Sequence, residues 1–432
     1  MVIHKHKLPA LPDYDNCLVN LANSILKRFG AETTARTLPL ADKYLEGIGI
    51  KNNADKAVDQ GNCSQNGSDS ENTDVTGSES TLKYKNVVIL LLDALGTSIL
   101  EKHLDKDGFF RSHLAGSFHS VYPPTTVAAT TSVMSGLYPN EHGWLGWDMY
   151  YPELNKNVTV FTNTDQLKEK EGAKPAVGAS GEKVWGEDSL EESKASAEFN
   201  AGFTFTPYKS IVDKINDAGG RAYFSMPFMP PYPGDLDEIL ERIEDLCKEP
   251  GSKYIYAYWN EPDSTMHRTG TESPETHEMV TGLEKRIEEF ASGLSDTLLF
   301  IIADHGHIDS KNLCILDHPD IMECLVRLPS CEPRTLNLFV KDECREAFSD
   351  LFRKHFGDDF ILLTREETIA AGLFGTGKNR AGLEDMIGDF VAVAVSDTSI
   401  FKTHYETQEM PGVHAGLTPE EYIIPLIVII NN

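Results

Sequence analysis

The chain has 432 residues, of which 40% are hydrophobic and 25% are charged, values that are ordinary for a globular protein and exclude a fibrous or fully disordered chain. The formal net charge of -28 argues against partners such as long nucleic acid or an anionic membrane, because polyanions are repelled. Any phosphate-bearing substrate therefore needs a local source of positive charge.

The N-terminal region has no uninterrupted apolar segment and no small-residue cleavage site, so it does not resemble a signal peptide. No apolar run approaches the roughly 18 residues that a membrane span requires. The seven cysteines contain no C-x-x-C pair, which argues against a disulfide framework and against a standard zinc finger. We therefore expect a cytoplasmic protein without a membrane partner, and we leave its oligomeric state open.

The first third of the chain contains two segments of contrasting composition. Residues 14–30 carry apolar side chains on one face of a predicted helix, so residues 1–50 are expected to form a helical N-terminal extension. Residues 51–81 are rich in Asn, Ser, Asp and Gly and almost lack large apolar side chains. Such a segment cannot bury enough surface to order itself, and we predict a disordered acidic and polar loop.

From residue 86 onward, short apolar runs alternate with helical patterns, which is typical of an α/β fold with buried parallel strands. The clearest runs are NVVILLLD, KYIYAYWNEPD, TLLFIIADHG and YIIPLIVII. We expect a doubly wound, mostly parallel sheet formed by residues 82–310 and 400–432. Further strand patterns and a predicted helix near residues 342–355 indicate a small α+β cap insertion at 311–399, with continuation of the main sheet as the alternative.

Three of the four apolar runs end in an acidic residue, namely Asp93, Asp263 and Asp304. Ligands of open α/β sheets bind beyond the carboxyl ends of the strands, so these residues are expected to converge there. His267 stands four residues after Asp263, which places both side chains on one face of a helical turn, although a solvated charge pair would have the same spacing. His305 directly follows Asp304.

One more histidine, His414, lies in the glycine-rich loop before the last apolar run. Carboxylate and imidazole groups together favour zinc or a similar first-row metal over magnesium or calcium. The six residues suffice for two sites with three protein ligands each, which leaves a position open for a substrate or nucleophile. These candidate ligands are Asp93, Asp263, His267, Asp304, His305 and His414.

The segment VYPPTTVAATTSVMSGLYP places two prolines before Thr125 and Thr126 and predicts a helix over residues 127–134. Either threonine suits an N-cap. A threonine hydroxyl is a poor nucleophile unless a metal or a base lowers its pKa. We expect Thr126, beyond the Asp93 strand, to combine both roles, because a helix N-terminus also stabilises an alkoxide and a phosphate.

The chain resembles the alkaline phosphatase superfamily and, within it, the type I phosphodiesterase/nucleotide pyrophosphatase family. The resemblance rests on five motifs that occur in order: LLLDALG, PPTTVAATTSVMSGLYPNEHG, YWNEPDSTMH, ADHGH and GVHAGLTPEE. It covers about residues 84–309 and 404–430. It implies an alkaline phosphatase-like catalytic core with two divalent metal ions, expected to be Zn²⁺, with Mn²⁺ as the alternative.

The resemblance also implies a role for each motif residue. One metal would be held by Asp93, Thr126, Asp304 and His305, and the other by Asp263, His267 and His414. The activated hydroxyl of Thr126 would attack phosphorus in line, and water would then hydrolyse the phosphothreonine intermediate. The second metal would stabilise the leaving oxygen.

Two positions depart from the nucleotide pyrophosphatases in this resemblance. Val127 stands where those enzymes have a Phe that helps to hold the base, and Trp147 stands in place of an Asn that donates to the phosphoryl oxygen. Nucleotide selectivity therefore does not follow from the resemblance. Trp147 and Tyr150 are candidate substrate contacts, with a buried aromatic cluster as the alternative.

We expect a binuclear metal-dependent hydrolase of small phosphate esters, either a phosphodiesterase or a nucleotide pyrophosphatase. The alternatives are a phosphomonoesterase, a phosphonate hydrolase or a phosphomutase of the same superfamily, and a metal-binding pseudoenzyme that binds a partner. A sulfatase is disfavoured because its nucleophile motif does not occur at Thr126.

Overall fold

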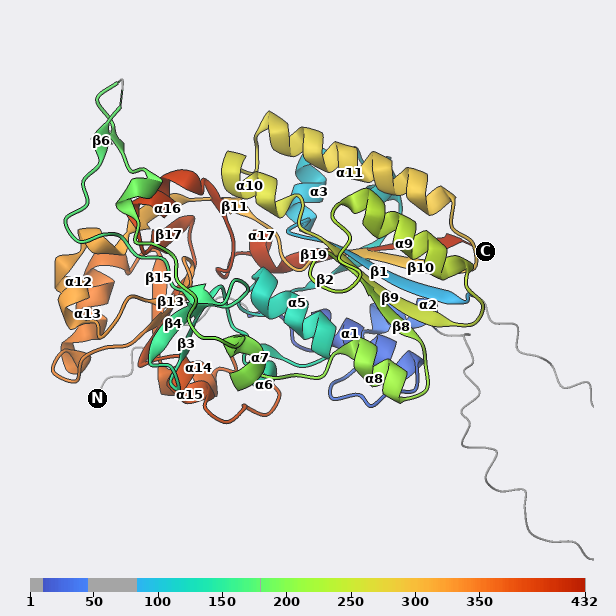
Figure 1. The fold of residues 1–432 in the computed structure, drawn as a ribbon, viewed down its shortest axis with the longest axis horizontal. Coiled ribbons are helices and arrows are strands. Elements are labelled where there is room, and N and C mark those ends of the chain that lie inside the picture. Colours follow the sequence, from blue (N-terminus) through green and yellow to red (C-terminus); the bar gives the residue numbers. More distant parts are fainter. Residues whose placement is uncertain (1–10, 46–83, 179, 432) are drawn as a thin grey trace, which may run out of the picture.

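The computed structural model describes residues 11–45, 84–178 and 180–431. The predicted loop at 51–81 lies outside these described residues. Two sheets lie side by side along the longest axis of the molecule, and helices pack around both (Figure 1). In the described part of the chain, no helix is long and apolar enough to cross a membrane.

Within the described residues, the central sheet contains six strands: β1 (Asn86–Leu92), β2 (Leu114–His119), β8 (Ala222–Ser225), β9 (Lys253–Trp259), β10 (Thr297–Ile302) and β19 (Ile423–Asn431). They follow the order β2-β19-β10-β1-β9-β8. Strands β10, β1, β9 and β8 run parallel, whereas β19 runs antiparallel to both of its neighbours. Every residue of β1 and β10 is buried, as expected for continuous apolar runs.

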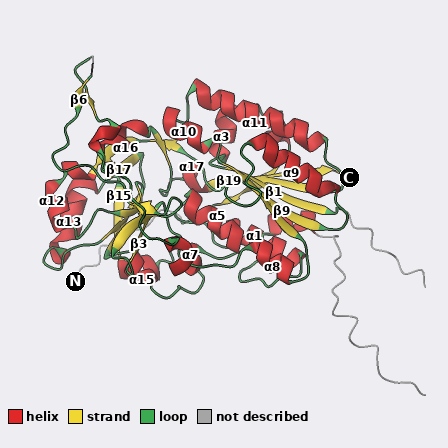
Figure 2. Cartoon of the chain, in the orientation of Figure 1, coloured by secondary structure: helices red, strands yellow, loops and turns green. Residues whose placement is uncertain are grey.

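Helices cover both faces of the central sheet (Figures 1 and 2). One layer contains α3 (Thr97–His103), α9 (Leu236–Lys248) and α11 (Pro274–Ser292). The opposite layer contains α1 (Leu18–Arg28), α5 (Thr126–Ser135) and α8 (Ile211–Asp217). This arrangement confirms the predicted α/β fold with a mostly parallel, doubly wound sheet.

The second sheet is antiparallel throughout its described strands: β3 (Asp148–Tyr151), β4 (Lys156–Thr159), β5 (Thr164–Asp165), β13 (Ser330–Glu332), β14 (Thr335–Leu338), β15 (Phe360–Thr364) and β16 (Phe390–Ala394). Their order is β15-β16-β14-β13-β3-β4-β5. Strands β3 to β5 precede the 311–399 segment, so this sheet combines strands from two distant parts of the chain.

Four helices accompany the second sheet: α12 (Pro319–Cys324), α13 (Arg345–Phe356), α14 (Arg365–Ala370) and α15 (Leu383–Met386). Helix α13 corresponds to the helix predicted near residues 342–355. Three of its phenylalanines, Phe348, Phe352 and Phe356, are buried in a core that is separate from that of the central sheet. The second sheet therefore has its own apolar support.

Shorter elements complete the described chain: α2 (Pro39–Leu45), α4 (Phe109–Ser112), α6 (Pro139–His142), α7 (Ala201–Phe205), α10 (Asp263–Thr269), α16 (His404–Glu409), α17 (Pro419–Tyr422), β6 (Ala176–Val177), β7 (Lys183–Val184), β11 (Ile308–Asp309), β12 (Lys311–Cys314), β17 (Thr398–Phe401) and β18 (Gly412–Val413). The pair β11 and β18 brings the loop after β10 beside the loop before β19.

Helix α5 begins one residue before its predicted start and ends at Gly136, which adopts the left-handed conformation with φ of 71°. A Cβ on Gly136 would lie 2.9 Å from Cδ1 of Leu26 on α1. The Asn23 side chain of α1 also donates a hydrogen bond to the Gly136 carbonyl at 2.9 Å. The N-terminal helix thus packs directly against the helix that carries Thr126.

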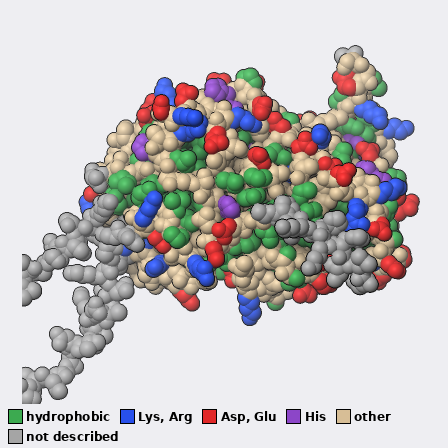
Figure 3. All heavy atoms as spheres, turned by 180° about the vertical axis from the view of Figure 1, so that it is seen from behind, with side chains coloured by type: hydrophobic (Ala, Val, Ile, Leu, Met, Phe, Trp, Pro, Cys, Tyr) green, Lys and Arg blue, Asp and Glu red, His purple; other side chains and the backbone are tan. Residues whose placement is uncertain are grey.

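The surface carries charges of both signs. On the face seen in Figure 3, Lys and Arg side chains are interspersed with acidic ones and form no continuous basic band among the described residues.

Candidate binuclear metal site

Three acidic residues follow three neighbouring parallel strands of the central sheet. Asp93 follows β1, Asp304 lies two residues after β10, and Asp263 begins α10 beyond β9. Because β10, β1 and β9 are adjacent and parallel, their carboxyl ends meet at one edge of the sheet. The structure brings the three carboxylates together at that edge.

The first group of potential ligands consists of Asp93, Asp304 and His305, all of which are buried. Nε2 of His305 lies 3.3 Å from Oδ1 of Asp93 and 3.5 Å from Oδ2 of Asp304. The hydroxyl Oγ1 of Thr126 lies 3.2 Å from the same Nε2 and 3.4 Å from Oδ2 of Asp93. The first residue of α5 therefore faces this group.

Burial raises the pKa of both carboxyl groups in the first group. The pKa of Asp93 lies well above its ordinary value because the group is desolvated and because Asp304 and Asp263 are close to it. Burial also raises the pKa of Asp304, although His305 opposes the shift. A cation at this position would supply the charge that these two carboxylates need in order to remain ionised.

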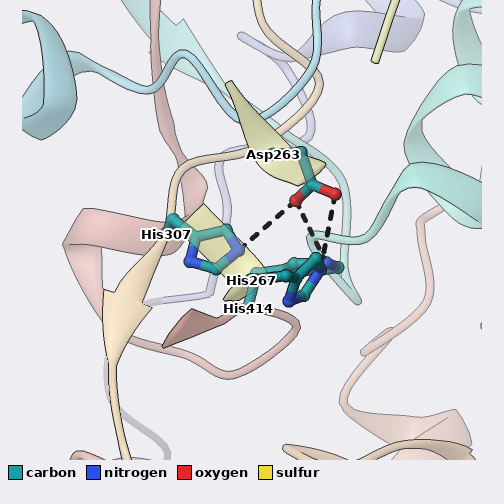
Figure 4. Close-up of side chains that lie close together, drawn as sticks. All are labelled: Asp263, His267, His307 and His414. Carbon is teal, nitrogen blue, oxygen red and sulfur yellow. Dashed lines mark ion pairs between the residues drawn. The ribbon is translucent and has the colours of Figure 1, made fainter. Parts of the chain in front are cut away.

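The second group consists of Asp263, His267, His307 and His414, whose side chains point toward one another (Figure 4). Oδ2 of Asp263 lies 3.4 Å from Nε2 of His267. Oδ1 of Asp263 lies 3.3 Å from Nε2 of His307 and 3.7 Å from Nε2 of His414. Burial opposes the charge of Asp263, but the surrounding histidines, His267 first, hold its pKa below its ordinary value.

Three of the histidines are oriented by backbone carbonyl groups. Nδ1 of His267 lies 2.8 Å from the carbonyl oxygen of Gly412. Nδ1 of His305 lies 3.0 Å from the carbonyl oxygen of Gly306, and Nδ1 of His414 lies 3.1 Å from that of Pro124. A carbonyl oxygen can only accept, so Nδ1 carries the proton in each ring. The lone pair of Nε2 therefore faces the ligand groups in all three residues, as metal-ligating histidines require.

Several buried polar atoms at the site have no hydrogen-bond partner among the described residues. They are Oδ2 of Asp304, Oδ1 of Asp263, and both ring nitrogens of His307. Buried polar groups normally find partners, so this concentration of orphaned atoms calls for a ligand. The donor set of imidazole nitrogens and carboxylate oxygens fits two divalent first-row cations such as zinc.

Gly306 permits the close approach on which the first group depends. A Cβ on Gly306 would lie 2.0 Å from the Glu420 carbonyl oxygen, and a Cβ on Gly96 would lie 2.6 Å from Cα of Gly306. The Gly306 N–H also donates to the Glu421 carbonyl oxygen at 2.8 Å. Only glycine leaves room for the chain to turn here, directly after the two ligands Asp304 and His305.

Thr125 occupies the N-cap position of α5, but its side chain makes no capping hydrogen bond. Instead, its hydroxyl donates to Oε1 of Glu332 on the second sheet at 2.6 Å. Thr125 and not Thr126 therefore occupies the N-cap position, so the expectation that Thr126 also caps the helix is wrong, and the Thr125 side chain makes no cap either. The buried carboxylate of Glu332 accounts for the difference, because a hydrogen bond to a carboxylate is stronger than the hydrogen bond that a hydroxyl accepts from a backbone N–H.

Two cavities flank Thr126. One has a volume of about 260 Å³ and a mostly apolar lining that includes Trp144, Phe161 and Phe228. The other has a volume of about 290 Å³ and is lined by residues of the second ligand group and of the second sheet, and by Trp147. Thr126 contributes to the lining of both.

The two candidate substrate contacts lie in different places. Trp147 is 43% exposed and lines the second cavity. Tyr150 lines neither cavity. Its ring packs against the ring of Phe339, with centroids 4.6 Å apart, and Cζ of the Arg327 guanidinium lies 3.9 Å from the Tyr150 ring centroid. The structure therefore brings Trp147, but not Tyr150, to the site.

A family model described as type I phosphodiesterase/nucleotide pyrophosphatase matches residues 87–416. The chain belongs to this family. The matched range includes all residues of both ligand groups, Thr126, and the second sheet.

Among curated relatives, venom phosphodiesterase 2 of Crotalus adamanteus is 24% identical over 193 residues, which cover 43% of this chain and 22% of the relative. Human ectonucleotide pyrophosphatase/phosphodiesterase family member 1 is 26% identical over 192 residues, which cover 43% of this chain and 19% of the relative. The chain thus spans about a fifth of the length of these curated relatives.

Solved structures with a similar fold include murine ectonucleotide pyrophosphatase/phosphodiesterase 5, an inactive variant in complex with AMP. It has a TM-score of 0.55 and 15% identity, and the alignment covers 79% of this chain and 87% of that one. Phosphonoacetate hydrolase from Sinorhizobium meliloti, in complex with phosphonoformate, has a TM-score of 0.55 and 16% identity over 80% and 90% of the two chains. These likenesses establish the fold.

His307 was not among the ligands expected from the sequence of this family member. His307 is the second histidine of the ADHGH motif, and its position two residues after His305 was the signal in the sequence that could have identified it. The pairing of Ile308 with Val413 carries His307 toward His414 and away from the first group. A pairing between residues so distant in the chain is not visible in the local pattern.

Proposed function

We propose that this protein hydrolyses phosphate diesters with Thr126 as nucleophile and with two divalent metal ions, most simply Zn²⁺, as cofactors. The observation that carries the proposal is the position of the Thr126 hydroxyl, 3.2 Å from Nε2 of His305 and 3.4 Å from the Asp93 carboxylate, at the start of α5. A hydroxyl in this position lies beside a ligand group that can lower its pKa.

The first ion would be held by Asp93, Asp304, His305 and the hydroxyl oxygen of Thr126. The second would be held by Asp263, His267 and His414, with His307 as a fourth ligand. Bound ions supply positive charge for the phosphoryl oxygens, which an acidic chain otherwise lacks, and favour the deprotonated form of the Thr126 hydroxyl. Mn²⁺ is the alternative to Zn²⁺.

The chain's own groups would then carry the reaction in two steps. In the first, Oγ1 of Thr126 bonds to phosphorus while the bond from phosphorus to one alcohol oxygen breaks, and the departing alcohol takes up a proton. In the second, water attacks the phosphothreonine and releases the threonine hydroxyl and a phosphate monoester. The backbone N–H groups in the first turn of a helix have no partner within the helix, so those of α5 would be available to the phosphoryl oxygens in both steps.

The two cavities favour a diester over a monoester. A diester has a substituent on either side of its phosphorus, and Thr126 lies between cavities of about 260 Å³ and about 290 Å³. A monoester would occupy one of them and leave the other to solvent. The apolar cavity suits a planar or apolar substituent, because Trp144, Phe203 and Phe228 present ring surface to it.

The relatives support this proposal in different ways. The venom enzymes are phosphodiesterases by name, and the murine neighbour in fold binds AMP, which carries a planar base. The phosphonoacetate hydrolase binds phosphonoformate, a compound with no ester bond, so this neighbour supports the fold and not the preference for diesters. A nucleotide diester would place its base in the apolar cavity, so we propose nucleotide-containing diesters as the first substrates to test.

The test is metal analysis followed by turnover of chromogenic substrates. We expect bis(p-nitrophenyl) phosphate to be cleaved faster than p-nitrophenyl phosphate and faster than p-nitrophenyl phenylphosphonate. Thr126→Ala should abolish turnover and retain metal, whereas Thr125→Ala should retain turnover because that hydroxyl faces Glu332. Equal rates for Thr126→Ala and wild type at equal metal content would refute the proposed nucleophile.

A further inference from the structure

The cavity beside the second ligand group has an unusual charge distribution. It lies between the two sheets and is lined by His267 and Asp263 on one side and by Glu332, Lys402 and Glu406 on the other. A substituent of phosphorus that extends away from the apolar cavity enters this space. The charges on the wall formed by the second sheet and α16 therefore act on that substituent.

Glu332 is the central residue of that wall. It ends β13 and is only 9% exposed. Its Oε1 accepts two hydrogen bonds, one from the Thr125 hydroxyl at 2.6 Å and one from the Trp147 N–H at 2.7 Å. Its Oε2 accepts no hydrogen bond from any residue that the structure describes, which leaves this oxygen for a group in the cavity.

The backbone holds Glu332 firmly in this position. The preceding residue, Cys331, is buried and has a φ of 81°, a left-handed conformation that costs a non-glycine residue free energy. A Cβ on Gly146 would lie 2.7 Å from Sγ of Cys331, so the loop that carries Trp147 presses directly on this segment. The two hydrogen bonds from Thr125 and Trp147 hold the carboxylate at the cavity, and the close contact between Cys331 and Gly146 limits movement of the backbone beneath it.

Lys402 does not neutralise the wall. It is the one Lys or Arg among the described lining residues, and its Nζ lies 2.7 Å from Oδ2 of Asp148 and 3.1 Å from Oε1 of Glu406. Both carboxylates raise the pKa of Lys402 against the effect of burial. Asp148 does not line the cavity, so the wall itself carries two carboxylates, Glu332 and Glu406, and one ammonium group. The wall is therefore net negative whenever Glu332 is ionised.

We propose that Glu332 is a specificity-determining residue that rejects a second phosphate. The cavity accepts substituents that are neutral or cationic, with Oε2 free to accept a hydrogen bond where the substituent has a donor, and it excludes the anionic di- or triphosphate extension of a nucleotide. The protein is then a diesterase that discriminates against nucleoside di- and triphosphates. This inference rests on the proposed function, because it concerns the second substituent of the same phosphorus.

The chain offers a matched pair of variants for the test. Glu332→Gln removes the charge and keeps an oxygen that can accept from Thr125 and Trp147. Glu409→Gln removes the same charge from an exposed position on α16 that does not line the cavity. The ratio of kcat/KM for the p-nitrophenyl ester of thymidine 5′-monophosphate to that for ATP is measured for the metal-loaded wild type and both variants.

We expect the wild type to prefer the ester, because its p-nitrophenyl substituent is uncharged, and Glu332→Gln to lower this preference roughly tenfold, mainly through the KM for ATP. Glu409→Gln should leave the ratio unchanged. A wild type that prefers ATP, or a Glu332→Gln variant with the wild-type ratio, would overturn the inference.

A binding measurement separates this inference from the proposed reaction. AMP and ADP are titrated into the same three metal-loaded proteins by calorimetry. Wild type should bind ADP no more tightly than AMP, and Glu332→Gln should improve the binding of ADP alone by roughly tenfold. If this selectivity is present and no ester is hydrolysed, the proposed function fails and the inference about Glu332 stands. If ADP binds wild type more tightly than AMP does, the inference fails whatever the turnover.

Discussion

His305 and His414 stack with ring centroids 3.8 Å apart and an interplanar angle of 23°, although they belong to different ligand groups. Burial and the proximity of His305 together lower the pKa of His414 well below its ordinary value. Neutral imidazoles can stack closely and can still offer Nε2 to a metal. The two groups therefore form one continuous site.

The second group provides the first prediction. His307→Ala should reduce the metal content from two ions per chain toward one, because His307 has two orphaned ring nitrogens and lies 3.3 Å from Asp263. Metal content is measured by mass spectrometry of the protein after dialysis against a weak chelator. His277→Ala, at an exposed histidine outside both groups, is the control. Two ions retained by His307→Ala would show that His307 is not a ligand.

Glu332 gives a prediction about pH and stability. Burial raises its pKa from 4.5 to about 7, although the hydrogen bond from Thr125 opposes the shift. Between these values the native state binds more protons than the unfolded state, so the free energy of unfolding falls as pH rises through this window. Glu332→Gln lacks this dependence. Wild type should therefore lose about 3 kcal/mol relative to Glu332→Gln between pH 4.5 and pH 7.

The measurement is urea unfolding of metal-loaded wild type and Glu332→Gln at several pH values. The same comparison for Glu409→Gln corrects for the general effect of one surface charge. Parallel stability curves for wild type and Glu332→Gln across this window would mean that Glu332 is ionised throughout.

A buried ion pair supports the loop that carries His414. Arg334 and Glu421 are both fully buried, with Nε to Oε1 at 2.7 Å and Nη2 to Oε2 at 2.9 Å. Glu421 also accepts from the Gly416 N–H at 2.6 Å. Arg334→Ala leaves a buried charge without its partner and should lower the free energy of unfolding by about 3–5 kcal/mol.

The free energy is again measured by urea unfolding. Lys311→Ala breaks a solvent-exposed pair with Asp397 and should cost less than about 1 kcal/mol. Similar losses in both variants would show that burial does not govern the contribution of the Arg334 pair.

Gly306 gives a prediction about geometry at the first group. Gly306→Ala places a Cβ 2.0 Å from the Glu420 carbonyl oxygen, so the segment after His305 must move. We expect loss of one bound ion and of turnover, together with lower stability. Gly282→Ala is the control, because the added Cβ meets no atom within 4 Å on α11 and alanine favours a helix. Wild-type metal content in Gly306→Ala would contradict the role given to this turn.

The fold and the ligand pattern were predictable to the extent that local sequence carries them. Continuous apolar runs identify β1, β9, β10 and β19 because strands buried on both faces need no polar positions. Acidic residues directly after three of these runs indicate a shared edge of one sheet. Parallel neighbours then place Asp93, Asp263 and Asp304 together without any knowledge of side-chain geometry.

Relationships between distant segments were not predictable. Cys331 of β13 pairs with Asp148 of β3, which joins two distant segments into one sheet, and no local pattern signals this contact. The same pairing places Glu332 beside Thr125, so a hydroxyl that suits an N-cap donates to a residue more than 200 positions away. His307 reaches the second group through β11 and β18 for a similar reason.

The most direct test of the central claim is rapid acid quench of the metal-loaded wild type during turnover of bis(p-nitrophenyl) phosphate, followed by mass spectrometry of its peptides. The account predicts a p-nitrophenylphosphoryl group on Thr126 in the wild type and its absence in Thr126→Ala, which should release no p-nitrophenol. A phosphoryl group on another residue, or steady turnover by Thr126→Ala, would contradict the account.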